Sequence, residues 1–189
     1  HFERVNLDLM YALPAQTLAG AEADVGTAIA SGVGHISAYH LTVEPNTAFH
    51  HAPPAALPDD DLAADMQEMV EAALMDGGFG HYETSAFARP GQQCRHNLNY
   101  WTFGDYLGIG AGAHGKLTFP DGSVVREVRR KLPADYLAAT DRVQTRHEVA
   151  ATELPGEFMM NALRLIDGFA PSLFEERTAG PLAALDTVM

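Results

Sequence analysis

A strand–helix–strand pattern at the start of the chain constrains the fold more than any other feature of the sequence. Residues 5–13 form a near-continuous apolar run, which is typical of a strand buried on both faces in a parallel sheet. From Leu18 the apolar residues recur at helical spacing, and Gly32 and Gly34 predict the end of that helix. Residues 35–43 predict a second strand. Because the connections are short, the two strands of this βαβ unit are expected to be parallel.

The rest of the chain predicts further strands and helices, so the expected fold class is α/β. Three aspartates from Asp59 onward open a helix, because carboxylates are favourable at a helix amino terminus, and Gly77-Gly78 closes it. The Asp-Gly pair at 121–122 predicts a hairpin turn. We also expect a strand over 81–88, a helix beginning near Ala134, and mainly helices after about residue 150.

The composition limits the classes of partner and the compartment. Apolar residues make up 47% and charged residues 20% of the 189 residues, an ordinary balance for a globular protein with a sizeable core. The net charge of −13 disfavours nucleic acid as a partner, because an acidic chain repels phosphate backbones. Cys94 is the only cysteine, which excludes a disulfide framework and favours a cytoplasmic location. No segment approaches the ~20 consecutive apolar residues of a transmembrane helix.

Polar side chains interrupt both predicted strands. In an alternating strand Asp8 shares a face with Asn6 and Met10, and Thr42 shares a face with His40. A carboxylate inside a buried strand must be paired or hydrogen-bonded. Asp8 is therefore either a capping residue that pins a loop or a ligand contact at the carboxyl end of a barrel strand, and the pattern favours neither. His40 taken alone is more typical of a hydrogen-bonded core residue.

The segment 108–115 is dense in glycine and contains the spacing G-x-G-x-x-G. A dinucleotide-binding fingerprint requires a helix after these glycines, whereas a strand and a turn follow here. The pattern instead indicates a backbone that passes close to a ligand or to another chain segment. His114, inside this segment, would then point at that ligand.

The densest group of functional side chains runs from Cys94 to Trp101 and holds a thiol, an imidazole, a carboxamide and two adjacent aromatic rings. Neither Cys94 nor His96 has companions at zinc-ligand spacing. One interpretation is a hydrogen-bonded loop anchored by Tyr100 and Trp101. The other is a site for a large, flat, partly apolar ligand, with His96 as an axial ligand to iron. Residue chemistry alone favours the loop.

Four motifs, taken together and in this order, resemble the HemW family of radical S-adenosylmethionine proteins. These are haem chaperones similar to the oxygen-independent coproporphyrinogen III oxidase. The motifs are NLDLMYALPAQT (6–17), LTVEPNT (41–47), RHNLNYW (95–101) and GDYLGIGAGAHG (104–115). The pattern His-Asn-x-x-Tyr-Trp within the third motif is specific, because the true oxidase lacks it. Ala12 departs from the family, in which glycine usually stands before Leu-Pro.

The resemblance implies a partial (β/α) barrel that carries S-adenosylmethionine and a [4Fe-4S] cluster at its strand ends. Carried over by position, Asp8 would contact S-adenosylmethionine, with Met10, Thr42 and His114 lining the same cavity. The family's cluster ligands form a Cys-x-x-x-Cys-x-x-Cys motif, which a chain with one cysteine lacks. The chain is therefore expected to be the carboxyl-terminal half of a longer protein, without the cluster-binding segment.

The resemblance also implies where the domains lie. Residues 1–132 would form the later strands of the radical S-adenosylmethionine barrel together with a family-specific extension. Residues 133–189 would form a small, mostly helical carboxyl-terminal domain, truncated at its end.

For function, the resemblance implies a haem chaperone that binds haem and delivers it to respiratory haem proteins. The haem site would consist of His96, Asn97, Tyr100 and Trp101, with His96 as the candidate iron ligand. The alternative is an enzyme, an oxygen-independent coproporphyrinogen III oxidase. A helix-turn-helix DNA reader at 150–189 is a third hypothesis, which the lack of an Arg/Lys-rich recognition face disfavours.

Overall fold

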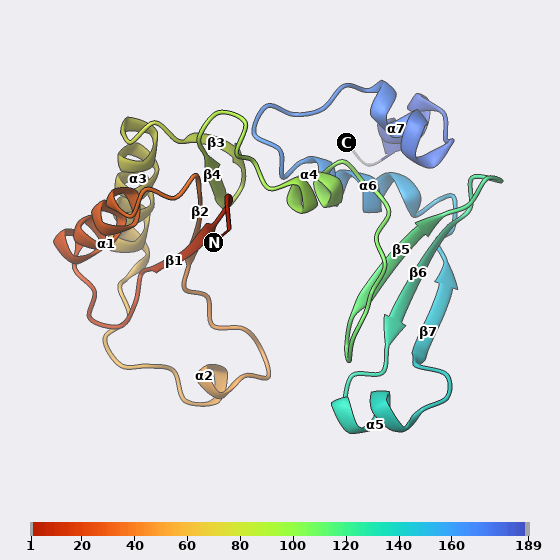
Figure 1. Ribbon diagram of the computed structural model, residues 1–189, viewed down its shortest axis with the longest axis horizontal. Coiled ribbons are helices and arrows are strands. Elements are labelled where there is room, and N and C mark those ends of the chain that lie inside the picture. Colours follow the sequence, from red (N-terminus) through yellow and green to blue (C-terminus); the bar gives the residue numbers. More distant parts are fainter. Residues whose placement is uncertain (1, 188–189) are drawn as a thin grey trace. The chain divides into compact units, whose positions relative to one another are not determined.

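The computed structural model describes residues 2–187. The chain forms two compact units, which are separated in sequence between Cys94 and Arg95 (Figure 1). Unit 1 ends at Cys94 and unit 2 begins at Arg95. Each unit contains both strands and helices and has a hydrophobic core of its own, so the α/β prediction is confirmed.

Unit 1 is built on a four-stranded sheet in the order β1-β2-β4-β3. Its strands are β1 (Asn6–Tyr11), β2 (His35–His40), β3 (Gly80–Glu83) and β4 (Ala86–Ala88). β1 and β2 run parallel, with Asn6 opposite His35 and Tyr11 opposite His40, which confirms the predicted βαβ unit. β2 ends at His40, earlier than the sequence pattern predicted.

Two helices, α1 (Leu18–Ala30) and α3 (Asp60–Asp76), cover one face of this sheet (Figure 1). The Thr17 hydroxyl caps α1 and the Asp59 carboxylate caps α3, each by accepting a hydrogen bond from a first-turn N–H group. Burying one large apolar side chain stabilises the fold by roughly 1.5–3 kcal/mol. The apolar side chains that α1 and α3 bury against the sheet therefore hold these helices in place. The largest buried side chains of this core are Val25, Ile36, Met66, Val70, Leu74, Phe79 and Phe87.

The single strand expected over 81–88 is wrong, because the chain reverses at Thr84-Ser85 to form the β3–β4 hairpin. His81 and Phe87 lie opposite each other across this hairpin, with their rings stacked at 4.2 Å between centroids. The only turn signals at this reversal are the hydroxyl residues Thr84 and Ser85, which favour turns more weakly than glycine, proline, asparagine or aspartate do.

The expectation that the first strand is buried on both faces is also wrong for the described structure. Along β1 the side chains alternate between exposed and partly buried, because helices cover only one face of the sheet. Asp8 and Met10 lie on the other face and are exposed. His40, expected in the core, is exposed and contacts only the edge of the Tyr11 ring, 5.7 Å away between centroids.

Unit 2 contains a three-stranded antiparallel sheet in the order β5-β6-β7. The strands are β5 (His114–Thr118), β6 (Val124–Arg129) and β7 (Val143–Glu148), and α5 (Pro133–Ala138) joins β6 to β7. The turn between β5 and β6 contains Asp121-Gly122, as predicted. The Asp121 carboxylate accepts hydrogen bonds from the N–H and hydroxyl groups of Ser123, and Gly122 adopts a φ of 87°.

Helices pack at the end of the second sheet where β6 begins (Figure 1). They are α4 (Arg95–Trp101), α6 (Leu154–Ala162), α7 (Ser172–Thr178) and the 3-10 helix η1 (Leu182–Thr187). Phe103, Val124, Phe158 and Phe174 form the centre of their shared core. The structure corrects the interpretation of residues 94–101 as a loop, because α4 occupies all but the first of them.

The predicted domain boundary at 132/133 falls inside the second sheet. β7 lies within the segment 133–189 and pairs with β6 from Val125 to Arg129, so that segment is not purely helical. The ladder between β6 and β7 keeps both sides of the predicted boundary in one compact unit. The two compact units are divided between Cys94 and Arg95, and the domain boundary at 132/133 stays a prediction.

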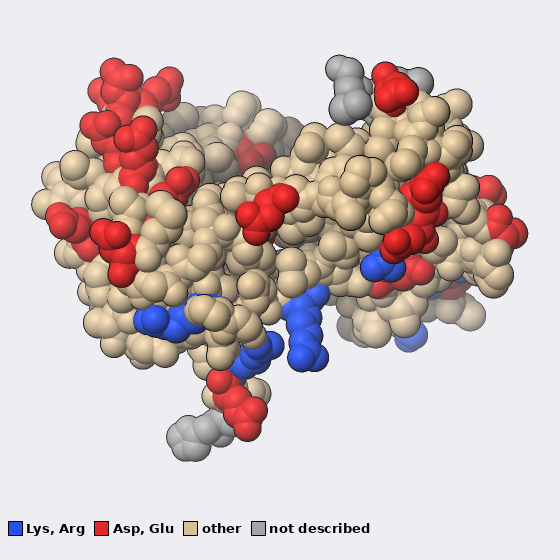
Figure 2. All heavy atoms as spheres, turned by 90° about the horizontal axis from the view of Figure 1, so that it is seen from above, with Lys and Arg blue, Asp and Glu red and all other residues tan. Residues whose placement is uncertain are grey.

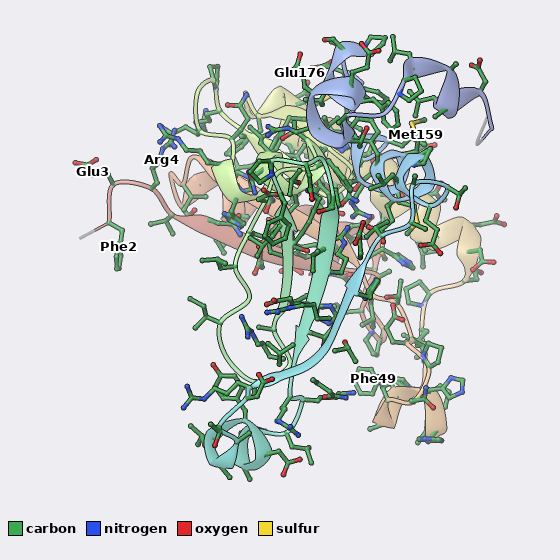
Figure 3. The ribbon with its side chains drawn as sticks, turned by 90° about the vertical axis from the view of Figure 1, so that its right-hand side faces the viewer. Phe2, Glu3, Arg4, Phe49, Met159 and Glu176 are labelled. Atoms are coloured by element: carbon green, nitrogen blue, oxygen red, sulfur yellow. The ribbon has the colours of Figure 1, made fainter. Side chains whose placement is uncertain are left out.

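Acidic side chains outnumber basic ones in this chain, 25 to 12. Figure 2 shows many Asp and Glu side chains and few Lys and Arg side chains on the face that it presents. The loop before α3 carries the short helix α2 (Ala48–His51), from which the half-exposed Phe49 projects (Figure 3). Among residues 2–187, no helix combines the length and the apolar character needed to span a bilayer.

Candidate functional site

A candidate site in unit 2 is an open pocket of about 500 Å³, which we call the aromatic pocket. Its walls come from α4, from the segment between α4 and β5, from the start of β5 and from α6. The lining residues are Tyr100, Trp101, Tyr106, Leu107, Gly108, Ile109, Ala113, His114 and Asn161. The volume lies within the range of known small-molecule and cofactor sites, roughly 300–1,000 Å³.

Three aromatic rings form the walls of the aromatic pocket. The Tyr100 ring lies edge to face with Trp101 at 6.3 Å and with Tyr106 at 4.6 Å between centroids. The guanidinium of Arg164 lies 4.4 Å from the centre of the Trp101 ring, a cation–π contact that holds the indole. The walls are therefore positioned by the protein before any ligand binds.

The rim of the aromatic pocket is apolar, and two polar side chains of the pocket lack a hydrogen-bond partner among the described residues. Leu107 and Ile109 are 68% and 83% exposed, although apolar side chains of this size are usually buried. The indole Nε1 of Trp101 is buried without a hydrogen-bond acceptor among the described residues. The His114 side chain, which is exposed, also makes no hydrogen bond within the described part of the chain. The pocket thus offers apolar surface and an imidazole to a ligand.

A buried ammonium group fixes the segment that leads into the aromatic pocket. Lys116 is 1% exposed, and its Nζ donates to the Asp105 carboxylate at 2.9 Å and to the Phe103 carbonyl at 3.0 Å. The same ammonium lies 4.1 Å from the centre of the Phe103 ring. Burial lowers the pKa of Lys116, against the opposing effect of Asp105. Burial would raise the pKa of Asp105, but hydrogen bonds from Lys116 and Thr118 outweigh it and lower that pKa.

Arg126 on β6 connects the wall of the pocket to α6. Its Nη1 donates to the Tyr106 hydroxyl at 3.0 Å, while Nε donates to the Glu157 carboxylate at 2.9 Å. Charge-assisted hydrogen bonds of this kind are stronger than neutral ones, so Tyr106 is held from behind.

Glycine is required where the chain crosses the start of β5. A Cβ atom on Gly108 would lie 2.4 Å from the carbonyl oxygen of His114, which no side chain tolerates. Gly110 and Gly112 adopt φ values of 108° and 72°, which are costly for other residues. The close approach at Gly108 lies within the glycine-rich segment 108–115 itself, because the segment folds back so that Gly108 meets His114 at the start of β5.

Unit 1 has a buried hydrogen-bond network on the sheet face that its helices leave open, which we call the polar network. His35 is 3% exposed, with Nδ1 2.6 Å from the Asn6 side-chain oxygen and Nε2 2.7 Å from the Tyr82 hydroxyl. The Ser37 hydroxyl donates to the same Asn6 oxygen at 3.2 Å. The Asn6 amide donates to the Asp8 carboxylate at 2.8 Å, so the network ends on an exposed carboxylate.

The residues predicted to bind S-adenosylmethionine lie in both units. Asp8 and Met10 share the open face of β1, and Thr42 follows the end of β2, where its hydroxyl donates to Glu44 at 3.2 Å. His114 lies in unit 2, in the aromatic pocket. That the four residues line one cavity stays a prediction.

Cys94 is not an activated nucleophile. Burial raises the pKa of its thiol, and the carboxylates of Asp8 and Glu83 add to this effect against the lowering effect of Arg4. A thiol with a raised pKa is protonated at neutral pH and reacts slowly. Within residues 2–187, no group of three or more His, Cys, Asp and Glu side chains could hold a metal ion.

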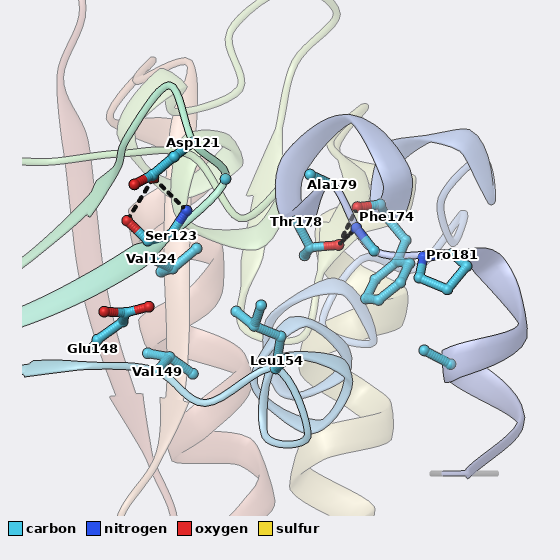
Figure 4. A pocket seen from close by; sticks show the side chains of 14 residues that line it. Asp121, Ser123, Val124, Glu148, Val149, Leu154, Phe174, Thr178, Ala179 and Pro181 are labelled. Atoms are coloured by element: carbon cyan, nitrogen blue, oxygen red, sulfur yellow. Dashed lines mark hydrogen bonds between the residues drawn. The ribbon is translucent and has the colours of Figure 1, made fainter.

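A second cavity of unit 2, about 490 Å³, contains none of the predicted site residues (Figure 4). It lies between the β5–β6 turn and α7, with Val124 and Phe174 among its apolar walls. Two of its polar side chains are paired locally, since Asp121 accepts from Ser123 and the Thr178 hydroxyl donates to the Phe174 carbonyl at 2.7 Å. It therefore offers a ligand less unpaired chemistry than the aromatic pocket does.

Relatives with known names match most of the chain. Heme chaperone HemW of Escherichia coli (strain K12) is 49% identical over 162 residues, which are 86% of this chain and 42% of that protein. Heme chaperone HemW of Haemophilus influenzae is 49% identical over 173 residues, 92% of this chain and 45% of that protein. The Bacillus subtilis (strain 168) protein of the same name is 35% identical over 188 residues, 97% of this chain and 49% of that protein. The chain belongs to the HemW family.

The chain spans about half the length of the HemW relatives that it matches. No family model matches it. Among solved structures, the coproporphyrinogen III oxidase HemN of Escherichia coli, described as a radical SAM enzyme, matches with a TM-score of 0.73. The match covers 96% of this chain and 45% of the HemN chain at 17% identity. At this identity the likeness shows the fold alone, which is part of a radical SAM fold.

The structure separates the four residues of the HemW-family motif that were predicted to bind haem. Tyr100 and Trp101 line the aromatic pocket, whereas His96 and Asn97 do not. His96 is exposed, and its ring contacts the edge of the Tyr100 ring at 6.3 Å between centroids. The assignment of all four residues to haem stays a prediction.

Several residues of these sites carry no local sequence signal. Asn161 reaches the aromatic pocket from α6, sixty positions after Trp101 in the chain. His35 and Tyr82 enter the polar network through the pairing register of β1, β2 and the β3–β4 hairpin. Alternation places Asn6 and Asp8 on one face, but only the strand register brings His35 beside them.

Proposed function

We propose that this chain forms the haem-binding part, and a share of the S-adenosylmethionine site, of a haem chaperone of the HemW family. The observation that supports it is the aromatic pocket, whose walls include the Tyr and Trp of the family motif. The names of the relatives, heme chaperones at up to 49% identity, point to the same ligand.

Haem suits the aromatic pocket because it is flat, largely apolar and large. Tyr100 and Trp101 offer ring surface on which a macrocycle can pack, and Leu107 and Ile109 offer exposed apolar surface at the rim. An open pocket also suits a cargo that must leave again, because an enclosed one would have to unfold for release. We therefore treat haem as the cargo of this protein and respiratory haem proteins as its acceptors.

The family pattern assigns Asp8, Met10, Thr42 and His114 to S-adenosylmethionine. Of these residues Asp8, Met10 and Thr42 belong to unit 1, and they would form the share of the S-adenosylmethionine site that unit 1 supplies. The donor set of unit 1 fits such a ligand, since an exposed carboxylate and a thioether share one open strand face. A carboxylate accepts hydrogen bonds from hydroxyl groups and favours a nearby cation. With a [4Fe-4S] cluster, S-adenosylmethionine supplies radical chemistry. The cluster ligands would lie outside this chain, because clusters are held by several cysteine thiolates and the chain has one cysteine.

Fewer observations support the alternative function, an oxidase. The likeness to HemN is a likeness of fold at 17% identity, and folds host many functions. An anaerobic assay of the full protein with coproporphyrinogen III, S-adenosylmethionine and a reductant addresses this alternative. Sustained decarboxylation would favour the oxidase over the chaperone.

The haem proposal is tested by titrating the full protein with haem and following the absorbance of the bound form. Trp101→Ala removes a wall of the aromatic pocket and should weaken haem binding roughly tenfold, which corresponds to about 1.4 kcal/mol. Phe119→Ala is the matched control, because Phe119 is also an aromatic residue of unit 2 but is 45% exposed and outside the pocket. Saturable, stoichiometric binding that Trp101→Ala weakens and Phe119→Ala leaves unchanged supports the proposal. Absence of saturable haem binding in the wild-type protein overturns it.

A further inference from the structure

The aromatic pocket contains one imidazole, and it does not come from the family's histidine motif. His114, the first residue of β5, lines the pocket together with Tyr100 and Trp101, whereas His96 does not. We propose that His114 is the protein ligand to the haem iron, an assignment that rests on the proposed haem-binding function.

The strand pairing places His114 on the same face of the second sheet as Lys116. Side chains alternate along β5, so His114 and Lys116 share a face, and Lys116 is the buried residue that contacts Phe103 of the unit 2 core. Arg126, opposite Lys116 on β6, reaches Tyr106 and Glu157 from the same face. His114 therefore stands on the face that bears the aromatic walls, at the open end of that face.

The backbone of His114 is fixed while its ring is uncommitted. Gly108 packs against the His114 carbonyl, and the ladder to β6 places His114 opposite Val128. Its ring makes no hydrogen bond, ion pair or ring contact among the described residues. An imidazole held by its backbone and free at both nitrogen atoms can coordinate iron without breaking an existing interaction.

The aromatic walls define how a planar ligand could reach this imidazole. Tyr100 and Trp101 project from the last turn of α4, and Tyr106 supports the Tyr100 ring edge to face. A macrocycle packed between these rings and His114 would have aromatic contact on one side and an axial ligand on the other. Ile109, 83% exposed at the rim, would then cover the edge of the macrocycle.

His96 is in a different position. It lies one helical turn before Tyr100 on α4, is exposed, and touches only the edge of the Tyr100 ring. Tyr100 contributes to the pocket, but the His96 side chain is not part of the lining. In this arrangement His96 supports the Tyr100 ring as a positioning residue and leaves iron ligation to His114.

The test compares His114→Gln with His96→Gln in the full protein, using haem and metal-free protoporphyrin IX as two probes of one pocket. Loss of an iron ligand should weaken haem binding at least about tenfold and shift its Soret band, while protoporphyrin IX binding changes less than about twofold. His96→Gln should leave the Soret band in place. His114→Gly with added imidazole provides a second measurement, because free imidazole should restore the wild-type Soret band.

The outcomes separate this proposal from the proposed function. If the wild type binds neither haem nor protoporphyrin IX, both the proposed function and the assignment of His114 are overturned. If the wild type binds haem and His114→Gln keeps its Soret band and affinity, only the ligand assignment falls. Equal losses for haem and protoporphyrin IX would make His114 a wall and not an iron ligand. If His114→Gln retains the haem spectrum but loses S-adenosylmethionine binding, His114 belongs to the cofactor site and the assignment is overturned.

Discussion

The candidate sites of the two units differ in how their polar groups are hydrogen-bonded. In unit 1 the groups of the polar network are connected to one another, from the buried Tyr82 and His35 to the exposed Asn6 and Asp8. In unit 2 the aromatic pocket leaves the Trp101 indole nitrogen without an acceptor among the described residues. A connected network fixes one charge in one orientation, whereas an incomplete pocket is completed by its ligand.

This difference corresponds to the two ligands proposed for the chain. A cofactor that must be held in one orientation is served by an exposed carboxylate with a rigid support, as Asp8 is by Asn6. A cargo that must be received and released is served by apolar surface at an open rim, as at Leu107 and Ile109. The comparison therefore predicts that changes in one unit alter one ligand and leave the other.

The largest expected effect is on the core of unit 2 and tests whether the units are independent. Phe158 is fully buried, with its ring 5.1 Å from Phe169 and 5.2 Å from Phe174 between centroids. Phe158→Ala should destabilise unit 2 by about 3–5 kcal/mol, because it leaves a cavity in an aromatic core. Amide hydrogen exchange should show lost protection across unit 2 and retained protection in unit 1. Equal loss in both units would break the comparison.

The next effect concerns the buried ion pair beside the aromatic pocket. Asp105→Asn should cost about 2 kcal/mol, because Lys116 stays buried without its counter-charge; Asp105 is 41% exposed, so the loss is below that of a fully buried pair. Denaturant unfolding measures it. Lys116→Met in the Asp105→Asn background removes the unpaired charge and should restore part of the stability. A further loss in the double variant would contradict the ion-pair account.

The same pair predicts a dependence of stability on pH. Hydrogen bonds from Lys116 and Thr118 hold the pKa of Asp105 below its unfolded value of about 3.9, against the effect of burial. The stabilisation is therefore fully present above about pH 4 and is lost as the pH falls through the lower pKa of the folded state. Asp105→Asn should remove this part of the acid dependence.

Local chemistry made much of unit 1 predictable. The helix limits of α1 and α3 follow from Thr17, Asp59 and the glycines after each helix, because caps and stops act over a few residues. The β3–β4 reversal and α4 were not predictable in the same way. The reversal at Thr84-Ser85 has only hydroxyl residues as turn signals, which are weaker than glycine, proline, asparagine or aspartate. The helix α4 has only seven residues and no buried side chain to give it an apolar period.

The candidate sites were predictable where one segment carries the chemistry. Tyr100 and Trp101 were identified within a single motif, and His114 from the glycines around it, which the structure shows to be needed for a close backbone crossing. What joins His114 to Tyr100 is the bridge between Tyr106 and Lys116 of β5, together with the contact between the Tyr100 and Tyr106 rings. His35 likewise meets Asn6 only through strand register. Contacts of this kind depend on the whole fold and leave no local pattern.

A smaller effect sharpens the account of the polar network. Tyr82→Phe removes the hydroxyl that contacts His35 Nε2 and accepts from the Cys94 N–H group, and should cost about 1–2 kcal/mol. Tyr39→Phe is the control, because Tyr39 belongs to the same sheet but is 42% exposed, and should change little. If the network orients Asp8, Tyr82→Phe should also weaken S-adenosylmethionine binding in the full protein while haem affinity is unchanged. Parallel loss of both ligands would contradict the division between the units.

The smallest effect reverses the usual sign of a glycine substitution. Ala12 is buried after β1 with a φ of 59°, a left-handed conformation that costs a residue with a Cβ atom roughly 1–2 kcal/mol. Ala12→Gly removes this strain and also removes one buried methyl group, so a net gain of about 0.5–1 kcal/mol is expected. Ala28→Gly is the control, because Ala28 is also buried but lies in a helix, and it should lose about 1 kcal/mol of stability.

Unit 2 has a residue in the same left-handed conformation as Ala12, namely Phe103 with a φ of 54°. The Phe103 ring belongs to the core and lies against the Lys116 ammonium, so glycine at this position should destabilise the protein. Thermal unfolding measures the change in stability at both positions. A gain for Ala12→Gly and a loss for Phe103→Gly would show that strain decides the effect in unit 1 and the side chain decides it in unit 2. A loss for Ala12→Gly would mean that the methyl group outweighs the strain.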